Sequence, residues 1–142
     1  MLKFLLEIVT PERRVFQQEV TMVTVPTPDG TIGVLARHVP LFTVLVEGEI
    51  KITDEKDEYY LAIGGGFMEV TGKKVTILVA RASHAHELNE AEIKKAQEAA
   101  RQVIEKRTKG AELAQAQAIM RRAILELKVL QRHRKARRDV TI

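Results

Sequence analysis

Over the first eighty residues, apolar and polar side chains alternate in short runs that are separated by turn residues. The first run places Leu2, Phe4, Leu6 and Ile8 on one face, which is the pattern of a half-buried strand. Strand-like runs return over residues 14–16, 20–25, 32–35, 41–46, 49–53, 59–63, 67–70 and 75–80. Nine or ten short strands at intervals of roughly 8–12 residues predict an antiparallel β-sandwich or barrel. The intervening segments are too short for a crossover helix, so we expect no parallel sheet.

The segment from Gly30 to Gly48 predicts two strands around a rigid corner. Apolar runs at 32–35 and 41–46 flank the corner, whose sequence is Arg-His-Val-Pro. Pro40 fixes its own backbone and disfavours the helical region for the residue before it. We therefore expect His38 to be held at a fixed place on a shaped contact surface. The dense turn residues just before the segment, which end in Asp29-Gly30, predict a tight turn.

After residue 80 the apolar period changes to that of a helix. Asn89 predicts an N-cap, and the apolar positions after it extend a first helix to Arg107. The segment 108–110 breaks this helix, and Gly110 is suited to its C-terminal cap. A second helix is predicted over about residues 111–136. Two helices joined by a short loop predict an antiparallel hairpin.

The second helix carries an apolar heptad stripe with Ile124 beside it. The members of the stripe are Leu113, Ala116, Met120, Ala123, Leu127 and Leu130. Alanine buries little apolar area, at about 25 cal/mol per Å². We therefore expect an isolated hairpin to be marginally stable and able to change its packing partner. The expected organisation is a β-sandwich domain over residues 1–86 and a mobile helical hairpin over residues 87–142.

Composition changes this picture mainly through charge. The chain has 142 residues and no cysteine, which excludes disulfides and thiolate chemistry. We see no signal peptide and no apolar run near the ~20 residues that cross a bilayer. Residues 1–86 carry 9 Lys and Arg against 11 Asp and Glu, whereas residues 87–142 carry 14 against 8. The net charge of +4 therefore comes from the helical end of the chain.

The sequence offers little for catalysis or for a cofactor. The triplet Gly64-Gly65-Gly66 is followed by Phe and Met, so it lacks the lysine and hydroxyl of a phosphate-binding loop. His84 and His86 have only Glu87 as an obvious third metal ligand. His38 lies among apolar residues without a nearby serine. We predict no catalytic residue, no metal site and no cofactor.

The basic residues of the second helix allow two interpretations. They could bind nucleic acid, which would make the chain a nucleic-acid-binding adaptor with a basic helical tail. No aromatic residue is interleaved with them, however, and they follow an apolar stripe along one helix. That combination favours docking into an acidic, partly apolar protein groove. A third interpretation, a ligand-binding enzyme domain, needs convergent titratable groups that the sequence does not offer.

Two motifs and the predicted hairpin together resemble the epsilon subunit of bacterial F-type ATP synthase. The first motif is Gly30-x-x-Gly33-Val34-Leu35-x-x-His38-x-Pro40-Leu41-x-Thr43-x-Leu45-x-x-Gly48. The second is Gly64-Gly65-Gly66-Phe67-x-Glu69-Val70, followed by Val75-Thr76-Ile77-Leu78. The resemblance covers nearly the whole chain. It implies a ten-stranded antiparallel β-sandwich followed by two helices.

The resemblance also implies a role without catalysis. The family forms part of the central rotor of a proton-translocating synthase, binds the gamma subunit and sits on the c-ring. It is peripheral to the cytoplasmic side of the bacterial plasma (inner) membrane. The implied c-ring contact is Asp29, Gly30 and Thr31, and the implied gamma contact is His38, Pro40 and Leu41. The helices, when extended, reach the alpha and beta subunits and inhibit ATP hydrolysis, with Arg121, Arg122, Lys128 and Arg132 as the implied contacts with the beta subunit.

Two positions depart from the family pattern. Members that bind ATP carry an Ile/Leu-Asp-x-x-Arg-Ala motif, and here Asn89 and Glu92 stand in place of its aspartate and arginine. The reversed charge would repel a phosphate, so we predict that the chain does not sense ATP directly. Thr31 stands where some relatives carry an acidic residue, so the polar contact with the c-ring is expected to be weaker or differently built.

Overall fold

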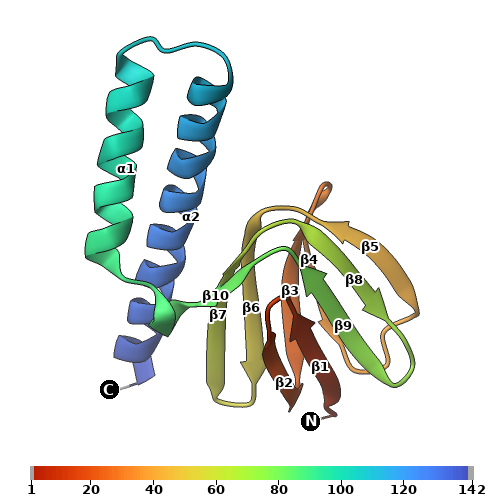
Figure 1. Ribbon diagram of the computed structural model, residues 1–142. Helices are drawn as coiled ribbons and strands as arrows, with labels where there is room; N and C mark the ends of the chain where they lie inside the picture. Colours follow the sequence, from red (N-terminus) through yellow and green to blue (C-terminus); the bar gives the residue numbers. More distant parts are fainter. Residues whose placement is uncertain (1, 141–142) are drawn as a thin grey trace. The chain divides into compact units, whose positions relative to one another are not determined.

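The computed structural model describes residues 2–140, and the side chains of residues 2–138. The described chain holds ten strands and two α-helices in two compact units, which divide between His84 and Ala85 (Figure 1). The strands are β1 (Phe4–Val9), β2 (Arg14–Val20), β3 (Met22–Thr27), β4 (Gly30–Leu35), β5 (Leu41–Leu45), β6 (Gly48–Asp54), β7 (Asp57–Ile63), β8 (Gly66–Val70), β9 (Lys74–Val79) and β10 (Ala82–His84). A short 3₁₀ helix, η1 (Ala85–Glu87), precedes α1 (Glu90–Glu105) and α2 (Ala111–Val140).

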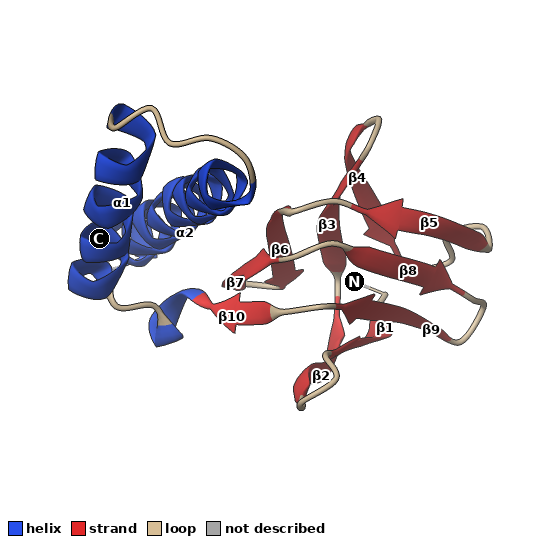
Figure 2. Ribbon diagram, turned by 45° about the horizontal axis from the view of Figure 1, so that its top comes forward, coloured by secondary structure: helices blue, strands red, loops and turns tan. Residues whose placement is uncertain are grey.

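The ten strands form two five-stranded sheets, which confirms the predicted β-sandwich. The first sheet has the order β2-β1-β9-β8-β5, and the second has the order β10-β7-β6-β3-β4 (Figure 2). Alternate side chains of both sheets meet in one core, which includes Leu6, Ile8, Ile52, Leu61 and Ile77. The period-two pattern read from the sequence is therefore the inward and outward alternation of a sandwich.

The expectation that no strands pair in parallel is wrong at one place. β1 pairs with β9 in parallel, with Leu6 opposite Val75 and Ile8 opposite Ile77. Two parallel strands must be joined by a long connection, but that connection does not have to contain a helix. Here the connection is the whole run from β2 to β8, which passes through both sheets before β9 returns beside β1.

The glycine triplet bends the chain between β7 and β8 and permits close backbone approach. The N–H of Gly64 donates to the carbonyl of Arg81 at 3.0 Å, and the carbonyl of Gly65 accepts from Ala80 at 3.0 Å. A Cβ on Gly66 would lie 2.0 Å from the carbonyl oxygen of Leu78. That distance is too short for any residue with a side chain, so this position requires glycine. The triplet is thus explained by packing.

The helical unit is an antiparallel hairpin, as predicted (Figure 1). Asn89 caps α1, since its Oδ1 accepts from the N–H of Glu92 at 3.1 Å. All six predicted stripe residues of α2 are buried or half-buried, but Ile124 is 53% exposed and does not belong to the seam. Val129, which the stripe did not include, is wholly buried.

Gly110 does not cap α1 as expected. The residue that turns left-handed after α1 is Arg107, at φ 55°, and its N–H donates to the carbonyl of Ile104 at 3.1 Å. Gly110 is also left-handed, at φ 73°, but its carbonyl accepts from Ala114 and so begins α2. The loop therefore needs two left-handed residues, and glycine supplies only one of them.

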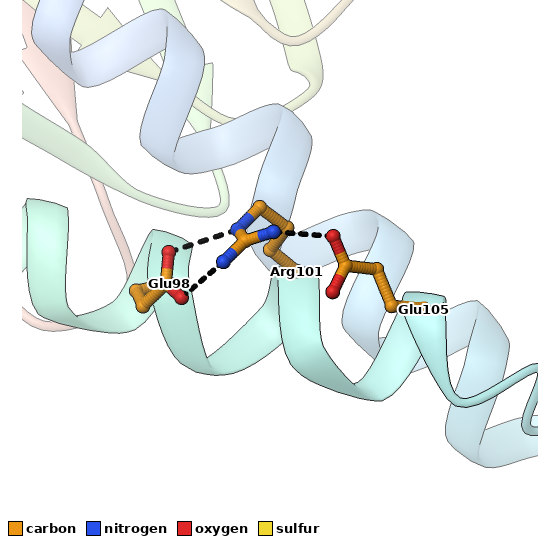
Figure 3. Close-up of polar contacts among 3 residues, drawn as sticks. All are labelled: Glu98, Arg101 and Glu105. Atoms are coloured by element: carbon orange, nitrogen blue, oxygen red, sulfur yellow. Dashed lines mark hydrogen bonds and ion pairs between the residues drawn. The ribbon is translucent and has the colours of Figure 1, made fainter.

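An exposed charge network stabilises α1 along its own length. The Arg101 guanidinium donates to both oxygens of Glu98, at 2.9 and 2.5 Å, and also pairs with Glu105 one turn further on. Figure 3 shows the guanidinium between the two carboxylates. These carboxylates raise the pKa of Arg101 above its usual value, with the hydrogen bond to Glu98 as the largest cause. Pairs three and four residues apart support a helix independently of its partner.

Candidate interaction surfaces

The tip of the β3–β4 hairpin is a tight two-residue turn. Thr27 pairs with Gly30 in the ladder, so that Pro28 and Asp29 form the turn. The Thr27 hydroxyl is buried beneath it, donates to the Gly30 carbonyl at 2.6 Å and accepts from the Asp29 N–H at 3.3 Å. Gly30 has φ 121°, a conformation that favours glycine. Asp29, Gly30 and Thr31 are thereby exposed on a stiff support.

The corner between β4 and β5 is fixed by its backbone. Arg37 is left-handed at φ 64°, and the His38 N–H donates to the Leu35 carbonyl at 3.2 Å. The His38 ring is half-buried, and its Nδ1 donates to the Val39 carbonyl at 2.7 Å. Val39 itself is 71% exposed.

The residues predicted at this corner do not share one surface. Pro40 is exposed, whereas Leu41 is half-buried and packs against the sandwich core. The structure therefore places Leu41 as a support of the corner, and His38, Val39 and Pro40 at or near its surface.

A row of exposed apolar side chains lies on the outer face of the first sheet, beside this corner. We call Phe42, Val44, Phe67 and Leu78 the apolar patch. Val44 lies opposite Phe67, and Phe67 lies opposite Leu78, so three neighbouring strands contribute to it (Figure 2). The rings of Phe42 and Phe67 stack with centroids 5.6 Å apart. Phe42 is 65% exposed, and each of the other three is about half exposed.

The alternating pattern of the sequence does not by itself predict the apolar patch. The signal was present in β5, where Leu-Phe-Thr-Val-Leu is apolar on both faces instead of alternating. Such a run is typical of a strand that is covered on both sides. In this chain one side faces the core and the other is exposed, and contiguous exposed apolar surface of this kind marks an interaction site.

Three of the four predicted basic contacts lie on one face of α2. Arg121, Lys128 and Arg132 are separated by seven and four residues, so they project from the same side of the helix. We call these three residues the basic stripe. Arg122 is one residue off this face, and its Nε lies 3.5 Å from Oε1 of Glu126. All four side chains are exposed.

The start of α1 holds the two residues that depart from the nucleotide-binding motif. Asn89 is engaged as the helix cap, and Glu92 is exposed in the first turn. They adjoin a pocket of about 780 Å³ that is lined by His86, Glu87, Leu88, Asn89, Glu90, Ala91 and Lys94. Hydrogen bonds from Arg134 and then Lys94 lower the pKa of Glu90, so the pocket wall holds an anionic carboxylate. The absence of ATP binding remains a prediction.

The described side chains include no group of three or more histidine, aspartate or glutamate residues placed to hold a metal ion. Among the described residues, no helix combines the length and the apolar character that a bilayer crossing requires. The β3–β4 tip, the β4–β5 corner, the apolar patch and the basic stripe are exposed surfaces of the kind that bind other proteins.

Comparison with known proteins finds a matching family and relatives that share one description. Residues 3–85 match the family described as ATP synthase, Delta/Epsilon chain, beta-sandwich domain. The ATP synthase epsilon chain of Chloroflexus aggregans is 39% identical over 134 residues, covering 94% of this chain and 96% of that protein. The ATP synthase epsilon chain of Herpetosiphon aurantiacus is 43% identical over 124 residues, covering 87% and 91%.

Solved structures share the fold. A chain of the Euglena gracilis mitochondrial ATP synthase aligns with a TM-score of 0.66 at 23% identity, covering 94% of this chain and 81% of that one. A chain of the Tetrahymena thermophila mitochondrial ATP synthase central stalk and c-ring aligns with a TM-score of 0.57 at 15% identity, covering 91% and 97%. At these identities the likeness concerns the arrangement of strands and helices.

Proposed function

The chain belongs to the family of ATP synthase epsilon chains, and from this premise we propose that it couples the rotation of a c-ring to ATP synthesis as a non-catalytic rotor subunit. The observation that carries the proposal is the match to a relative over 94% of the chain, which includes both the sandwich and the hairpin. As part of a proton-translocating synthase, the subunit is peripheral to the cytoplasmic face of the bacterial plasma membrane. The two units then have separate tasks, anchoring for the sandwich and control for the hairpin.

The sandwich anchors the subunit to gamma through the apolar patch and the adjoining corner. β5 begins directly after Pro40, so the exposed corner and Phe42 follow one another along the same segment. Exposed aromatic and aliphatic side chains are the groups that dominate the energy of protein interfaces when a partner covers them. His38 and Pro40 lie at the edge of this interface, and Leu41 supports it from the core side.

The β3–β4 tip contacts the c-ring. Both similar solved structures are described as containing a c-ring, which supports this assignment. The buried Thr27 hydroxyl binds the turn on both sides, so the tip is suited to transmit torque without deforming. The contact uses Asp29 as its charged group, because Thr31 carries no charge.

The hairpin restrains ATP hydrolysis when it extends toward the alpha and beta subunits. The basic stripe then docks on an acidic surface of beta, with long-range attraction that salt screens. Arg122 contributes less than the stripe, because it points to another side of the helix and pairs with Glu126. The alanine-rich seam supports this assignment, since little buried area has to be given up when the helices separate.

The anchoring part of the proposal is tested by a double substitution, Phe42→Ser with Phe67→Ser. Both side chains are exposed, so the sandwich stays folded while its affinity for gamma falls by at least tenfold, measured by titration calorimetry or surface plasmon resonance. Leu2→Ser is the matched control, because Leu2 is an exposed apolar residue outside the apolar patch. Unchanged affinity in the double variant would place the gamma interface elsewhere.

The control part is tested by truncation after His86 and by the triple change Arg121→Ala, Lys128→Ala and Arg132→Ala. In a reconstituted synthase, the truncation leaves assembly intact and raises the rate of ATP hydrolysis, and the triple variant raises it in part. Lys95→Ala removes an exposed cation from α1 and serves as the control. A truncated enzyme no faster than the full one would show that the hairpin is not the brake.

Direct nucleotide sensing is excluded by this proposal. Titration of the isolated chain with ATP gives no saturable heat at low-millimolar concentrations. Restoring the family motif by Asn89→Asp with Glu92→Arg provides the comparison, since it removes the negative charge that opposes a phosphate. Saturable binding by the unchanged chain at low-millimolar ATP would overturn this part.

A further inference from the structure

Charged and titratable groups concentrate where the hairpin starts and ends. We define the hairpin base as η1, residues 90–94 of α1 and residues 130–138 of α2. η1 packs against α2 at this end (Figure 1). The described charged and titratable groups of the hairpin base are His86, Glu87, Glu90, Glu92, Lys94, Arg132, His133, Arg134, Lys135, Arg137 and Arg138.

An ion pair joins the two helices at the hairpin base. Nη1 of Arg134 lies 2.6 Å from Oε2 of Glu90, and Nζ of Lys94 lies 3.0 Å from the other carboxylate oxygen. Glu90 is the first residue of α1, so the pair fastens the beginning of one helix to the end region of the other. The two cations lower the pKa of Glu90, which keeps the carboxylate charged at neutral pH.

His133 is half-buried in α2, directly before Arg134 and one helical turn before Arg137. Burial lowers its pKa below the usual value, and the charges of Arg137, His86 and Arg134 lower it further. A proton on His133 would add a cation to a partly desolvated site that already holds several. The closed hairpin base therefore favours neutral His133.

We propose that the hairpin base is a proton-sensitive clamp, which holds α1 and α2 together at neutral pH and releases them as the pH falls. Separated helices leave His133 in water, where it binds a proton near its ordinary pKa of about 6.5. Because its pKa is lower in the closed base, the open form takes up the proton first, and closure loses stability as the pH drops below that value.

Glu90 acts in the same direction at lower pH. Its pKa is lowered in the closed base, so the ion pair stabilises closure above the ordinary carboxyl pKa and is lost as the pH falls through the lowered one. Among the described residues, Glu87 and Glu92 are the other acidic groups of the hairpin base, and their charges would attract a protonated His133. The permanently charged neighbours Arg134 and Arg137 oppose that attraction.

The clamp is a property of the isolated chain. Its consequence for ATP hydrolysis, a hairpin biased toward the extended posture in acid, rests on the proposed function. The test below uses no synthase and no ATPase assay, so its outcome is independent of whether the hairpin is the brake.

The experiment measures the distance across the hairpin base with spin labels on Ala91→Cys and Lys135→Cys. Both positions are exposed, and the chain has no other cysteine. Double electron–electron resonance at pH 8.0 and pH 5.5 is expected to show one short distance at the higher pH and a longer population at the lower. One proton limits the rise in the open-to-closed ratio to about tenfold per pH unit. A distance distribution that does not change with pH would overturn the proposal.

Two variants attribute the change to His133. With His133→Gln the site cannot be charged, so the base stays closed at both pH values. With His133→Arg the charge is permanent, so the longer population is already present at pH 8.0. His38→Gln, which removes a histidine from the sandwich, leaves the wild-type response intact. A wild-type response in His133→Gln, or a closed base at pH 8.0 in His133→Arg, would overturn the proposal.

A direct titration keeps the proposal testable even if a variant fails to fold. The ring proton signal of His133 in the otherwise unchanged chain, followed by NMR, is expected to report a pKa below about 6.5. A pKa at or above that value would contradict the clamp, because the closed base would then not disfavour the proton.

Discussion

The sandwich and the hairpin are built on different amounts of buried side chain. The largest wholly buried side chains, such as Leu6, Ile52 and Ile77, all lie in the strands of the sandwich. The hairpin buries alanines at 100, 116 and 123 alongside a few larger residues. Since hydrophobic stabilisation scales with buried apolar area, the sandwich can serve as a fixed anchor and the hairpin as an element that changes state.

The two units also differ in how charge is used. In the sandwich, ion pairs join neighbouring strands and loops, as Arg81 and Glu47 do at 2.5 Å. In the hairpin, the ion pair between Arg101 and Glu98 lies within α1 and supports that helix alone. The ion pair between Arg134 and Glu90 joins α2 to α1. The helices are thus supported separately, while the contact between them depends in part on ionisation.

The largest expected effect tests the core of the sandwich. Ile77→Ala removes a wholly buried side chain, and we expect the free energy of unfolding to fall by about 2–5 kcal/mol. Urea denaturation followed by circular dichroism measures it. Ile124→Ala is the matched control in the hairpin, because Ile124 is more than half exposed, and its effect should stay within about 0.5 kcal/mol. Equal losses would show that Ile77 is not packed in the core of the sandwich.

Close packing between β8 and β9 predicts the next effect. Gly66→Ala would place a Cβ 2.0 Å from the Leu78 carbonyl oxygen, and relief of that overlap should cost about 1–3 kcal/mol. Gly72→Ala is the control, since nothing lies within 4 Å of the added Cβ. Thermal unfolding of both variants distinguishes them, and a Gly66→Ala variant as stable as the original chain would contradict the close approach.

The cap of α1 predicts a smaller and local effect. Asn89→Ala removes the acceptor of the Glu92 N–H and should cost about 1 kcal/mol in the stability of α1. Hydrogen exchange should become faster for the amides of α1 and remain unchanged for the strands. Asn89→Asp keeps an acceptor and serves as the control. Faster exchange in the strands as well would mean that the hairpin and the sandwich unfold together.

The smallest expected effect is the pH dependence that Glu90 gives to the hairpin. Because Arg134 and Lys94 lower its pKa, the pair stabilises the hairpin above the ordinary carboxyl pKa, and this contribution is lost as the pH falls through the lowered value. Helix protection measured by hydrogen exchange should therefore decrease below about pH 4.5. Glu90→Gln should lack this step, and its persistence in that variant would assign it to another carboxylate.

Much of the fold could be predicted because its signals are local. Period-two runs gave the strands, and Asn89 with the following apolar period gave the start of α1 at its observed place. The end of α1 was predicted less well, because a left-handed Arg107 replaces the glycine that usually marks such a position. The surfaces were harder to predict, since the apolar patch depends on which strands lie side by side.

The candidate residues show the same division. Asp29-Gly30 was predicted as a tight turn from its residue types, and Asp29, Gly30 and Thr31 form an exposed tip. Leu41 was predicted beside His38, yet it packs against the core, and Phe42, one residue later, is exposed. A single step along a strand reverses the face, so a site on a strand requires the register as well as the sequence.

The sequence by itself determined the type and order of the elements, the change from strands to helices near residue 80, and the placement of positive charge on the second helix. These follow from periodicity and local backbone preference, which act over a few residues. Only the tertiary structure decided that β1 lies parallel to β9, that Phe42 stacks on Phe67, and that Glu90 meets Arg134. Each of these joins residues more than twenty positions apart, where the pairing energy depends on every intervening strand or helix having taken its place.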